Sequence, residues 1–246
     1  MRYRATVAYD GTDFSGWQAQ GGRGRTVQET LERALSLVLR ERVRVAAAGR
    51  TDAGVHAWGQ VVAFDASEAI ASCDALRRSL NGVLPRDVAV REVAPAPPGF
   101  DPRRDATLRG YRYRIWNAPY RSPFEERRAW QVPFALDLEA MREAAAALVG
   151  RRDFASLQGA DSRPRPSIRR VELSAVERRG HLVCYRIEAN SFVRHMVRNI
   201  VGQLVEVGRG RFPASGIEEL LAARDRRRAA ATAPPQGLVL EWVRYP

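Results

Sequence analysis

One short stretch carries the residues whose types and spacing best suit chemistry. Residues 48–64 read AGRTDAGVHAWGQVVAF, so one carboxylate, Asp52, and one guanidinium, Arg50, lie two positions apart between glycines. Glycines permit tight turns and the close approach of the backbone to a ligand. A neighbouring guanidinium keeps a carboxylate ionised, and an ionised carboxylate can act as a nucleophile or a base. The plain alternative is an aspartate that only bonds its own turn.

Two further stretches carry residues that could meet a substrate. In residues 108–116, LRGYRYRIW, a strand would place Tyr111 and Tyr113 on one face and arginines on the other. Aromatic side chains beside arginines suit base stacking and phosphate contact, although core tyrosines with solvated arginines would give the same pattern.

A helix predicted over residues 192–207 is the third such stretch. It places Arg198 and Arg194 at the edge of its apolar face, four residues apart. An arginine there is partly buried and needs a partner, for which Asp52 is a candidate, unless the side chain simply extends to solvent. His195 and Asn199 are expected to point away from the core into solvent.

The composition favours a polyanionic partner. The net charge is 40 − 28 = +12, and all 40 basic residues are arginines. Arginine binds phosphate through its planar fork, so nucleic acid is the simplest partner. Genome composition or surface ion pairs of a thermophile could also produce such a bias.

Several classes of protein are not expected. No apolar run approaches the roughly 18 residues of a membrane span, and no signal peptide is visible, so we expect a cytoplasmic protein. The two cysteines and three histidines lack zinc spacing, so we predict no metal. Nucleotide-binding and hydrolase motifs are absent, so we predict no cofactor.

The periodicity predicts an α+β fold. Strands are expected at residues 2–10, 43–48, 60–64 and 88–93, with helices at 26–40 and 73–80, the second ending at Asn81-Gly82. This β-α-β-β-α-β order is that of a ferredoxin-like unit. Strands at 110–116, 168–176, 181–188 and 238–243 and helices at 138–149, 192–207 and 216–228 indicate a second unit. We therefore predict two ferredoxin-like (RRM-like) halves, 1–98 and 99–246, whose antiparallel sheets meet around a basic central cleft.

Ordered motifs along nearly the whole chain resemble those of the tRNA pseudouridine synthase A family. They are YDG at 9–11, GRTDAGVH at 49–56, YRY at 111–113, NSF at 190–192, HMVRNIVG at 195–202 and GL at 237–238. The resemblance implies isomerisation of uridine to pseudouridine in the tRNA anticodon stem-loop, at positions 38, 39 and 40, without a cofactor.

The resemblance also implies roles for individual residues. Asp52 matches the catalytic aspartate, and Tyr111 matches the tyrosine that stacks on the target base. Arg198 matches the basic partner of the aspartate, Arg50 the arginine linked to base flipping, and Leu238 a substrate-binding position. The family is homodimeric, with one tRNA lying across both subunits.

Contacts with RNA are implied for a further set of residues, namely Phe100, Arg103, Arg104, Arg163 and Arg165. The chain departs from the family at Asp101, where a histidine is common and where an aspartate would repel phosphate. The loop 161–167 also diverges, although it stays rich in arginine.

Two other functions remain open on the residues. A non-catalytic RNA-binding module could use the same aromatic and basic strand. A metal-dependent nuclease could use Asp10, Asp13 and Asp52 as a carboxylate cluster, although no acidic pair lies beside Asp52 in the sequence.

Overall fold

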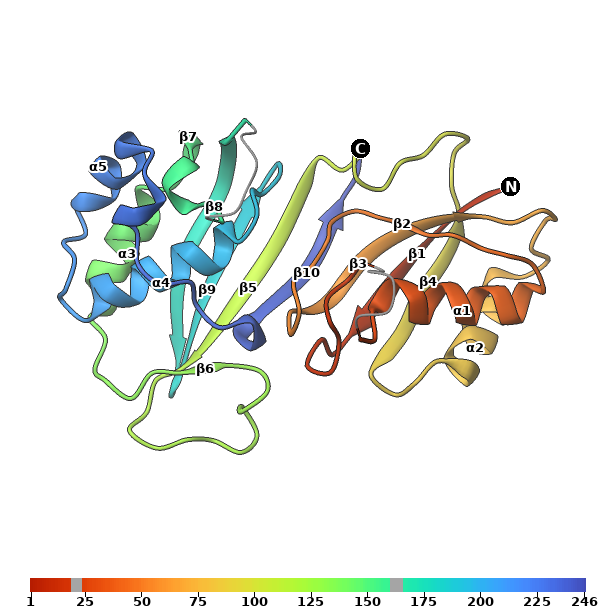
Figure 1. Ribbon diagram of the computed structural model, residues 1–246, viewed down its shortest axis with the longest axis horizontal. Coiled ribbons are helices and arrows are strands. Elements are labelled where there is room, and N and C mark those ends of the chain that lie inside the picture. Colours follow the sequence, from red (N-terminus) through yellow and green to blue (C-terminus); the bar gives the residue numbers. More distant parts are fainter. Residues whose placement is uncertain (19–23, 160–165) are drawn as a thin grey trace. The chain divides into compact units, whose positions relative to one another are not determined.

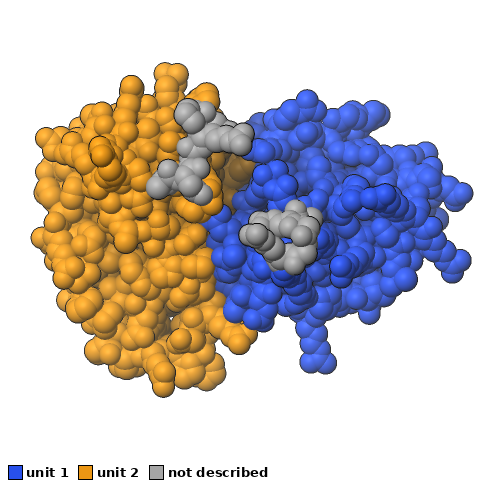
Figure 2. Space-filling view, in the orientation of Figure 1, with its two compact units in different colours: residues 1–107, 239–246 blue, residues 108–238 orange. Residues whose placement is uncertain are grey.

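The computed structural model describes residues 1–18, 24–159 and 166–246. The chain forms two compact units (Figure 2), which we describe separately. Unit 1 comprises residues 1–107 and 239–246, and unit 2 comprises residues 108–238. The described residues contain five α-helices and mostly antiparallel strands, so the predicted α+β class is confirmed.

Unit 1 has the predicted element order (Figure 1). Its elements are β1 (Arg2–Tyr9), α1 (Val27–Leu39), β2 (Ala46–Ala47), β3 (His56–Asp65), α2 (Cys73–Val83) and β4 (Val88–Pro95). β1 lies between β4 and β3 and is antiparallel to both. The other edge of β3 pairs antiparallel with β2 and, at its beginning, parallel with β10 (Leu238–Arg244). The β-α-β-β-α-β order is thus confirmed for this part of the chain.

The β1 and α1 patterns are realised as predicted. Tyr3, Ala5, Val7 and Tyr9 are the buried residues of β1 and alternate with more exposed ones. Thr26 caps α1, because its hydroxyl oxygen accepts a hydrogen bond from the Glu29 backbone N–H.

Two elements of unit 1 differ from the prediction. The expected strand at 43–48 is reduced to two residues, because Val43 and Val45 donate their N–H groups to Ser36 and Glu32 side chains of α1 instead. The helix α2 continues past Asn81 to Val83. Asn81 does not end the helix, because its amide bonds both backbone groups of Val90 on β4.

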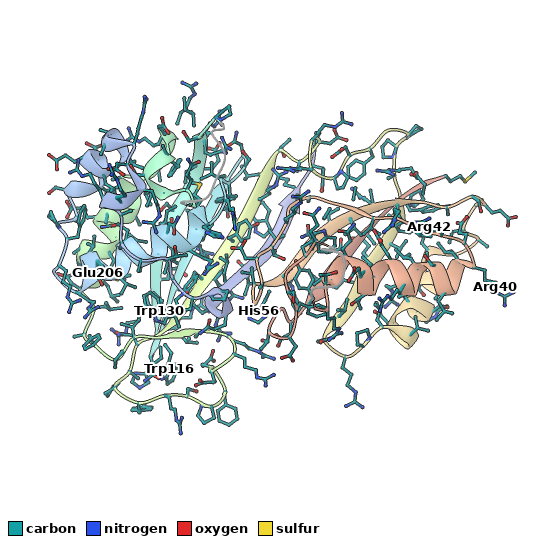
Figure 3. All side chains as sticks on the ribbon, viewed as in Figure 1. Arg40, Arg42, His56, Trp116, Trp130 and Glu206 are labelled. Atoms are coloured by element: carbon teal, nitrogen blue, oxygen red, sulfur yellow. The ribbon has the colours of Figure 1, made fainter. Side chains whose placement is uncertain are left out.

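Unit 2 contributes the other strands of the sheet, with helices packed against them. Its elements are β5 (Leu108–Trp116), β6 (Trp130–Gln131), α3 (Leu138–Ala146), β7 (Gly150–Asp153), β8 (Ile168–Arg179), β9 (Leu182–Ala189), α4 (Met196–Gly208) and α5 (Gly216–Ala223), with short 3₁₀ turns η1 (Ala155–Leu157), η2 (Arg226–Arg228) and η3 (Pro235–Gly237). The strand order β5-β9-β8-β7 is antiparallel throughout. β6 pairs parallel with β5, and Trp116 and Trp130 of these two strands are labelled in Figure 3.

The helices of unit 2 are shorter than predicted. α4 begins at Met196 rather than Phe192, because His195 has a φ of 61°, in the left-handed region where a helix cannot pass. α5 ends at Ala223 because Arg224 has a φ of 49°. α3 ends at Ala146, before the Gly150 that was expected to stop it.

The compact units do not coincide with the predicted halves. Unit 1 extends beyond residue 98 to Thr107, and it also takes the last strand from Val239 onward, which was assigned to the second half. The reason is the pairing of Val239 and Leu240 with His56 and Ala57 of β3. Over the described ranges, no helix is long and apolar enough to cross a membrane.

Candidate active site

Asp52 lies in the loop between β2 and β3 of unit 1. It is half-buried, and its carbonyl accepts a hydrogen bond from the Val55 N–H at 3.1 Å, which closes a four-residue turn. Gly54 has a φ of 76° in that turn, which a glycine adopts without strain. Arg50, in the same loop, is exposed. The predicted mount, a turn carrying a carboxylate before a strand, is therefore present.

The side chains of β1 and β3 hold the residues just before Asp52. The Tyr9 hydroxyl and the Thr51 hydroxyl are hydrogen-bonded at 2.8 Å. The Gln60 amide donates to the Gly49 carbonyl at 2.7 Å and to the Tyr9 hydroxyl at 3.5 Å. Burial raises the pKa of Tyr9 to about 12, so its hydroxyl keeps its proton at neutral pH. Gly49 and Thr51 are thus fixed to the sheet.

A second loop, residues 14–17, holds the Asp52 loop through backbone contacts. The Trp17 N–H donates to the Thr51 carbonyl at 3.0 Å, and the Gly54 N–H donates to the Phe14 carbonyl at 3.4 Å. Gly16 has a φ of 93°, and a Cβ there would lie 3.0 Å from the Thr51 oxygen. Because backbone hydrogen bonds hold the chain on both sides of Asp52, the backbone position of Asp52 is fixed.

The residue that begins β3, His56, ties the end of the loop to the turn after β1 (labelled in Figure 3). It is 6% exposed, and its Nδ1 accepts a hydrogen bond from the Gly11 N–H at 3.0 Å. The Asp10 carboxylate lies 3.2 Å from the same nitrogen and also accepts hydrogen bonds from Thr12. Within the described parts of the chain, no three His, Cys, Asp or Glu side chains are grouped as metal ligands.

The tyrosines of β5 have different environments. Tyr113 is fully buried and donates its hydroxyl to the Pro234 carbonyl at 2.7 Å, and burial raises its pKa. It is therefore a core residue, which was the plain alternative for this strand. Tyr111 is half-buried, with its ring edge-on to that of Phe192 at a centroid distance of 4.9 Å.

Arg198 lies in the first turn of α4 and is half-buried, as predicted. Its Nε donates to the Ala233 carbonyl at 2.8 Å, so one of its partners is a backbone oxygen. The prediction for its neighbour Asn199 was wrong: the residue is 0% exposed rather than solvated. Its amide donates to the Leu157 carbonyl and accepts from the Thr232 hydroxyl, which explains why a polar side chain is tolerated in this core.

The predicted residues are divided between the two units. Asp52 and Arg50 belong to unit 1, whereas Tyr111, Arg198 and the buried Leu238 belong to unit 2. The pairing of Arg198 with Asp52 stays a prediction.

The predicted RNA contacts of unit 1 surround Asp101. Phe100 is 8% exposed, and its ring meets that of Tyr245 at 5.1 Å. Arg103 and Arg104 are exposed, and their backbone N–H groups both donate to one Asp101 carboxylate oxygen. These N–H groups, led by that of Arg104, lower the pKa of Asp101. Asp101 therefore orders the loop that carries the two arginines. Arg163 and Arg165 lie outside the described residues.

Comparison with known proteins shows what this arrangement belongs to. A family profile described as tRNA pseudouridine synthase matches residues 5–103 and 144–246. The tRNA pseudouridine synthase A of Myxococcus xanthus is 48% identical over 245 residues, which cover 99% of this chain and 92% of the relative. The Geobacter sulfurreducens protein of the same name is 46% identical over 239 residues, covering 97% of each chain.

The chain belongs to the tRNA pseudouridine synthase A family. It is a pseudouridine synthase, an isomerase that acts on uridines of tRNA. The resemblance drawn from the motifs is thereby confirmed.

Several residues that shape the candidate site were given no role from the sequence, although Tyr9 lies in the YDG motif and Gln60 in the stretch 48–64. They are the supports of the Asp52 loop, Tyr9, Gly16 and Gln60. The sequence did contain a signal for Gln60. This polar residue directly precedes the apolar run 61–64, and a polar side chain in such a strand indicates a buried hydrogen bond. Tyr9 and Gly16 gave no such signal, since a core tyrosine and a turn glycine have the same local pattern.

Proposed function

We propose that this pseudouridine synthase isomerises uridines 38, 39 and 40 in the anticodon stem-loop of tRNA, with Asp52 as the nucleophile. The observation that carries the proposal is the mounting of Asp52. Its loop is hydrogen-bonded to β1 and β3 side chains on one side and to the backbone of residues 14–17 on the other. A carboxylate so held can meet a sugar or base carbon with little loss of freedom.

The chemistry needs no added group. Asp52 attacks either the ribose C1′ or the uracil C6, and the bond between C1′ and N1 breaks. The uracil turns and a bond forms between C1′ and C5. The hydrogen on C5 is lost to water, N1 takes up a proton from water in its place, and the carboxylate is released. A carboxylate suits this sequence because its adduct can collapse again.

The other substrate-binding roles are assigned by their chemistry. Tyr111 stacks on the target base, and its half-buried ring is already oriented by Phe192. Arg198 is the basic partner of Asp52 in the reaction, and Leu238 takes part in substrate binding. Arg50, which is exposed beside Asp52, takes part in moving the uridine out of its stack.

The remaining assignments concern the RNA and the assembly. Arg103 and Arg104, ordered by Asp101, contact phosphates, together with Phe100, Arg163 and Arg165. The protein acts as a cytoplasmic homodimer, with one tRNA lying across both subunits and no cofactor.

The position assignment is tested with tRNA transcripts that carry C5-tritiated uridine at one site each. Release of tritium to water reports the new bond at C5. We expect release from transcripts labelled at positions 38, 39 or 40 and none from a transcript labelled in another stem. Release from the other stem at the same rate would contradict the assignment to the anticodon stem-loop.

A further inference from the structure

The segment 229–237 of unit 2, drawn in dark blue in Figure 1, runs from η2 to β10 and is hydrogen-bonded to α4. Two buried amide side chains of α4 hold it: the Gln203 oxygen accepts from the Ala230 N–H at 2.9 Å, and the Asn199 oxygen accepts from the Thr232 hydroxyl at 2.6 Å. Gly202 lies between them, and a Cβ there would lie 2.0 Å from the Ala231 oxygen. These three α4 residues share one helix face, so the segment is in direct contact with the helix backbone.

The same segment holds Arg198 at two points. The Ala233 N–H donates to the Arg198 carbonyl at 3.1 Å, and the Ala233 carbonyl accepts from the Arg198 Nε at 2.8 Å. The next carbonyl, that of Pro234, accepts from the hydroxyl of Tyr113, two positions after Tyr111 on β5. The position of Ala233 therefore determines the position of the Arg198 guanidinium.

Asn199 is the buried centre of this arrangement. Besides Thr232, its oxygen accepts from Arg226 at 3.3 Å, and its nitrogen donates to the Leu157 carbonyl at 2.9 Å. Arg226 also donates to the Thr232 hydroxyl at 3.2 Å and to the Ala229 carbonyl at 3.0 Å. An amide can both donate and accept, so one side chain ties the segment to the core.

We infer that Asn199 is a positioning residue for uridine isomerisation: it fixes Thr232, which fixes Ala233, which sets the Arg198 guanidinium. The inference rests on the role proposed for Arg198. A group that must meet a substrate within a fraction of an ångström depends on such supports, because small displacements cost large factors in rate.

Two variants displace the segment in different ways. Thr232→Val keeps the side-chain shape and removes the hydroxyl that bonds Asn199 and Arg226, whereas Gly202→Ala pushes on the Ala231 oxygen. Ser174→Ala is the matched control, because it likewise removes a hydrogen-bonded hydroxyl of unit 2, in this case on β8 and bonded to the Tyr185 hydroxyl of β9 at 2.9 Å. The readouts are the single-turnover rate of tritium release from C5-labelled tRNA, the Kd for tRNA and the Tm.

We expect Thr232→Val and Gly202→Ala to lower the single-turnover rate about ten-fold or more, since a displaced catalytic contact has effects of this order. The tRNA Kd should change less than about two-fold, since most of the affinity comes from phosphate contacts elsewhere. Ser174→Ala should lower the Tm about as much as Thr232→Val and leave the rate unchanged. Equal rates in Thr232→Val and Ser174→Ala, or losses that follow the Tm alone, would overturn the positioning role.

The double variant with Arg198→Met separates this inference from the proposed function. If Thr232 acts through Arg198, Thr232→Val adds no further loss once the guanidinium is gone. Additive losses would overturn the positioning role while leaving Arg198 in the reaction. A wild-type rate for Arg198→Met would instead remove Arg198 from the proposed function, and the inference with it.

Discussion

At the scale of single residues, the site of this protein depends on side chains that do not themselves react. Tyr9 and Gln60 are fully or almost fully buried. The Tyr9 hydroxyl bonds the hydroxyl of Thr51, and the Gln60 amide bonds the carbonyl of Gly49, both just before Asp52 in the sequence. A buried polar atom is costly unless it is bonded, so these bonds constrain the loop in one arrangement. These bonds therefore position the carboxylate that we propose as the nucleophile.

Replacing Tyr9 with Phe removes the hydroxyl bonded to Thr51 and keeps the ring in the core. We expect a loss of about 1 kcal/mol in the free energy of unfolding and a clear fall in the rate of tritium release. Tyr185→Phe is the matched control, because its buried hydroxyl is bonded to that of Ser174 in unit 2 at 2.9 Å. It should cost similar stability, measured by denaturant unfolding, without a fall in rate. Equal rates for the two variants would contradict the role given to Tyr9.

The buried tyrosines also predict how stability depends on pH. Burial raises the pKa of Tyr9 to about 12, and it raises the pKa of Tyr113 and Tyr185 as well. In the unfolded chain a tyrosine has a pKa of about 10. The stability that these groups contribute is therefore complete below about pH 10 and is lost as the pH rises through their folded values. Tyrosine absorbance and circular dichroism should show these three hydroxyls ionising together with unfolding, and ionisation in the folded state would contradict it.

At the scale of elements, two loops far apart in sequence, residues 14–17 and the Asp52 loop, together position Asp52. Gly16 makes this possible, because its φ of 93° and its missing Cβ let residues 14–17 lie against Thr51 and Asp52. Local patterns could predict β1, α1 and β3, whose side-chain periods are regular. They could not predict that Val43 and Val45 bond to side chains of α1, because those bonds depend on how the chain packs against the helix. Nor could they predict the left-handed φ of His195 that ends the expected helix, because no side-chain period indicates it.

Gly16→Ala tests this contact between loops. The new Cβ would meet backbone atoms of Thr51, Asp52 and Ala53 at 3.0 to 3.3 Å, so the Asp52 loop must shift and the turnover should fall. The control is Gly150→Ala, since Gly150 has a nearly equal φ of 97° but a Cβ there would meet nothing within 4 Å. Both variants should lose about 1–2 kcal/mol of stability from the left-handed backbone. A normal rate in Gly16→Ala would show that the loop tolerates the displacement.

At the scale of the whole molecule, charge and connectivity matter most. The net charge of +12 with arginine as its source suits an enzyme that acts on a polyanion. The family could be predicted from ordered motifs, since these lie along the whole chain. The place of the last strand could not, because the parallel pairing of Val239 with His56 joins residues that are far apart in sequence and leaves no local pattern.

Binding of tRNA should weaken as salt rises, because phosphate contacts release counterions. Arg103→Ala removes one exposed guanidinium from the loop ordered by Asp101, and we expect the slope of log K against log salt to decrease by about one. Arg77→Ala on α2, whose guanidinium is bonded to Asp74 at 2.7 Å, serves as the control and should leave the slope unchanged. Filter binding over a salt series measures both. An unchanged slope for Arg103→Ala would remove that residue from the RNA contacts.

Asp52→Asn is the first variant to make, because it tests whether Asp52 forms the covalent bond to the substrate. The change keeps the size of the side chain and removes its charge. With C5-tritiated tRNA, we expect the variant to bind tRNA within a few-fold of wild type and to release no tritium above background, while wild type releases it in the absence of any cofactor. Tritium release by Asp52→Asn at a rate close to that of wild type would show that Asp52 is not the nucleophile.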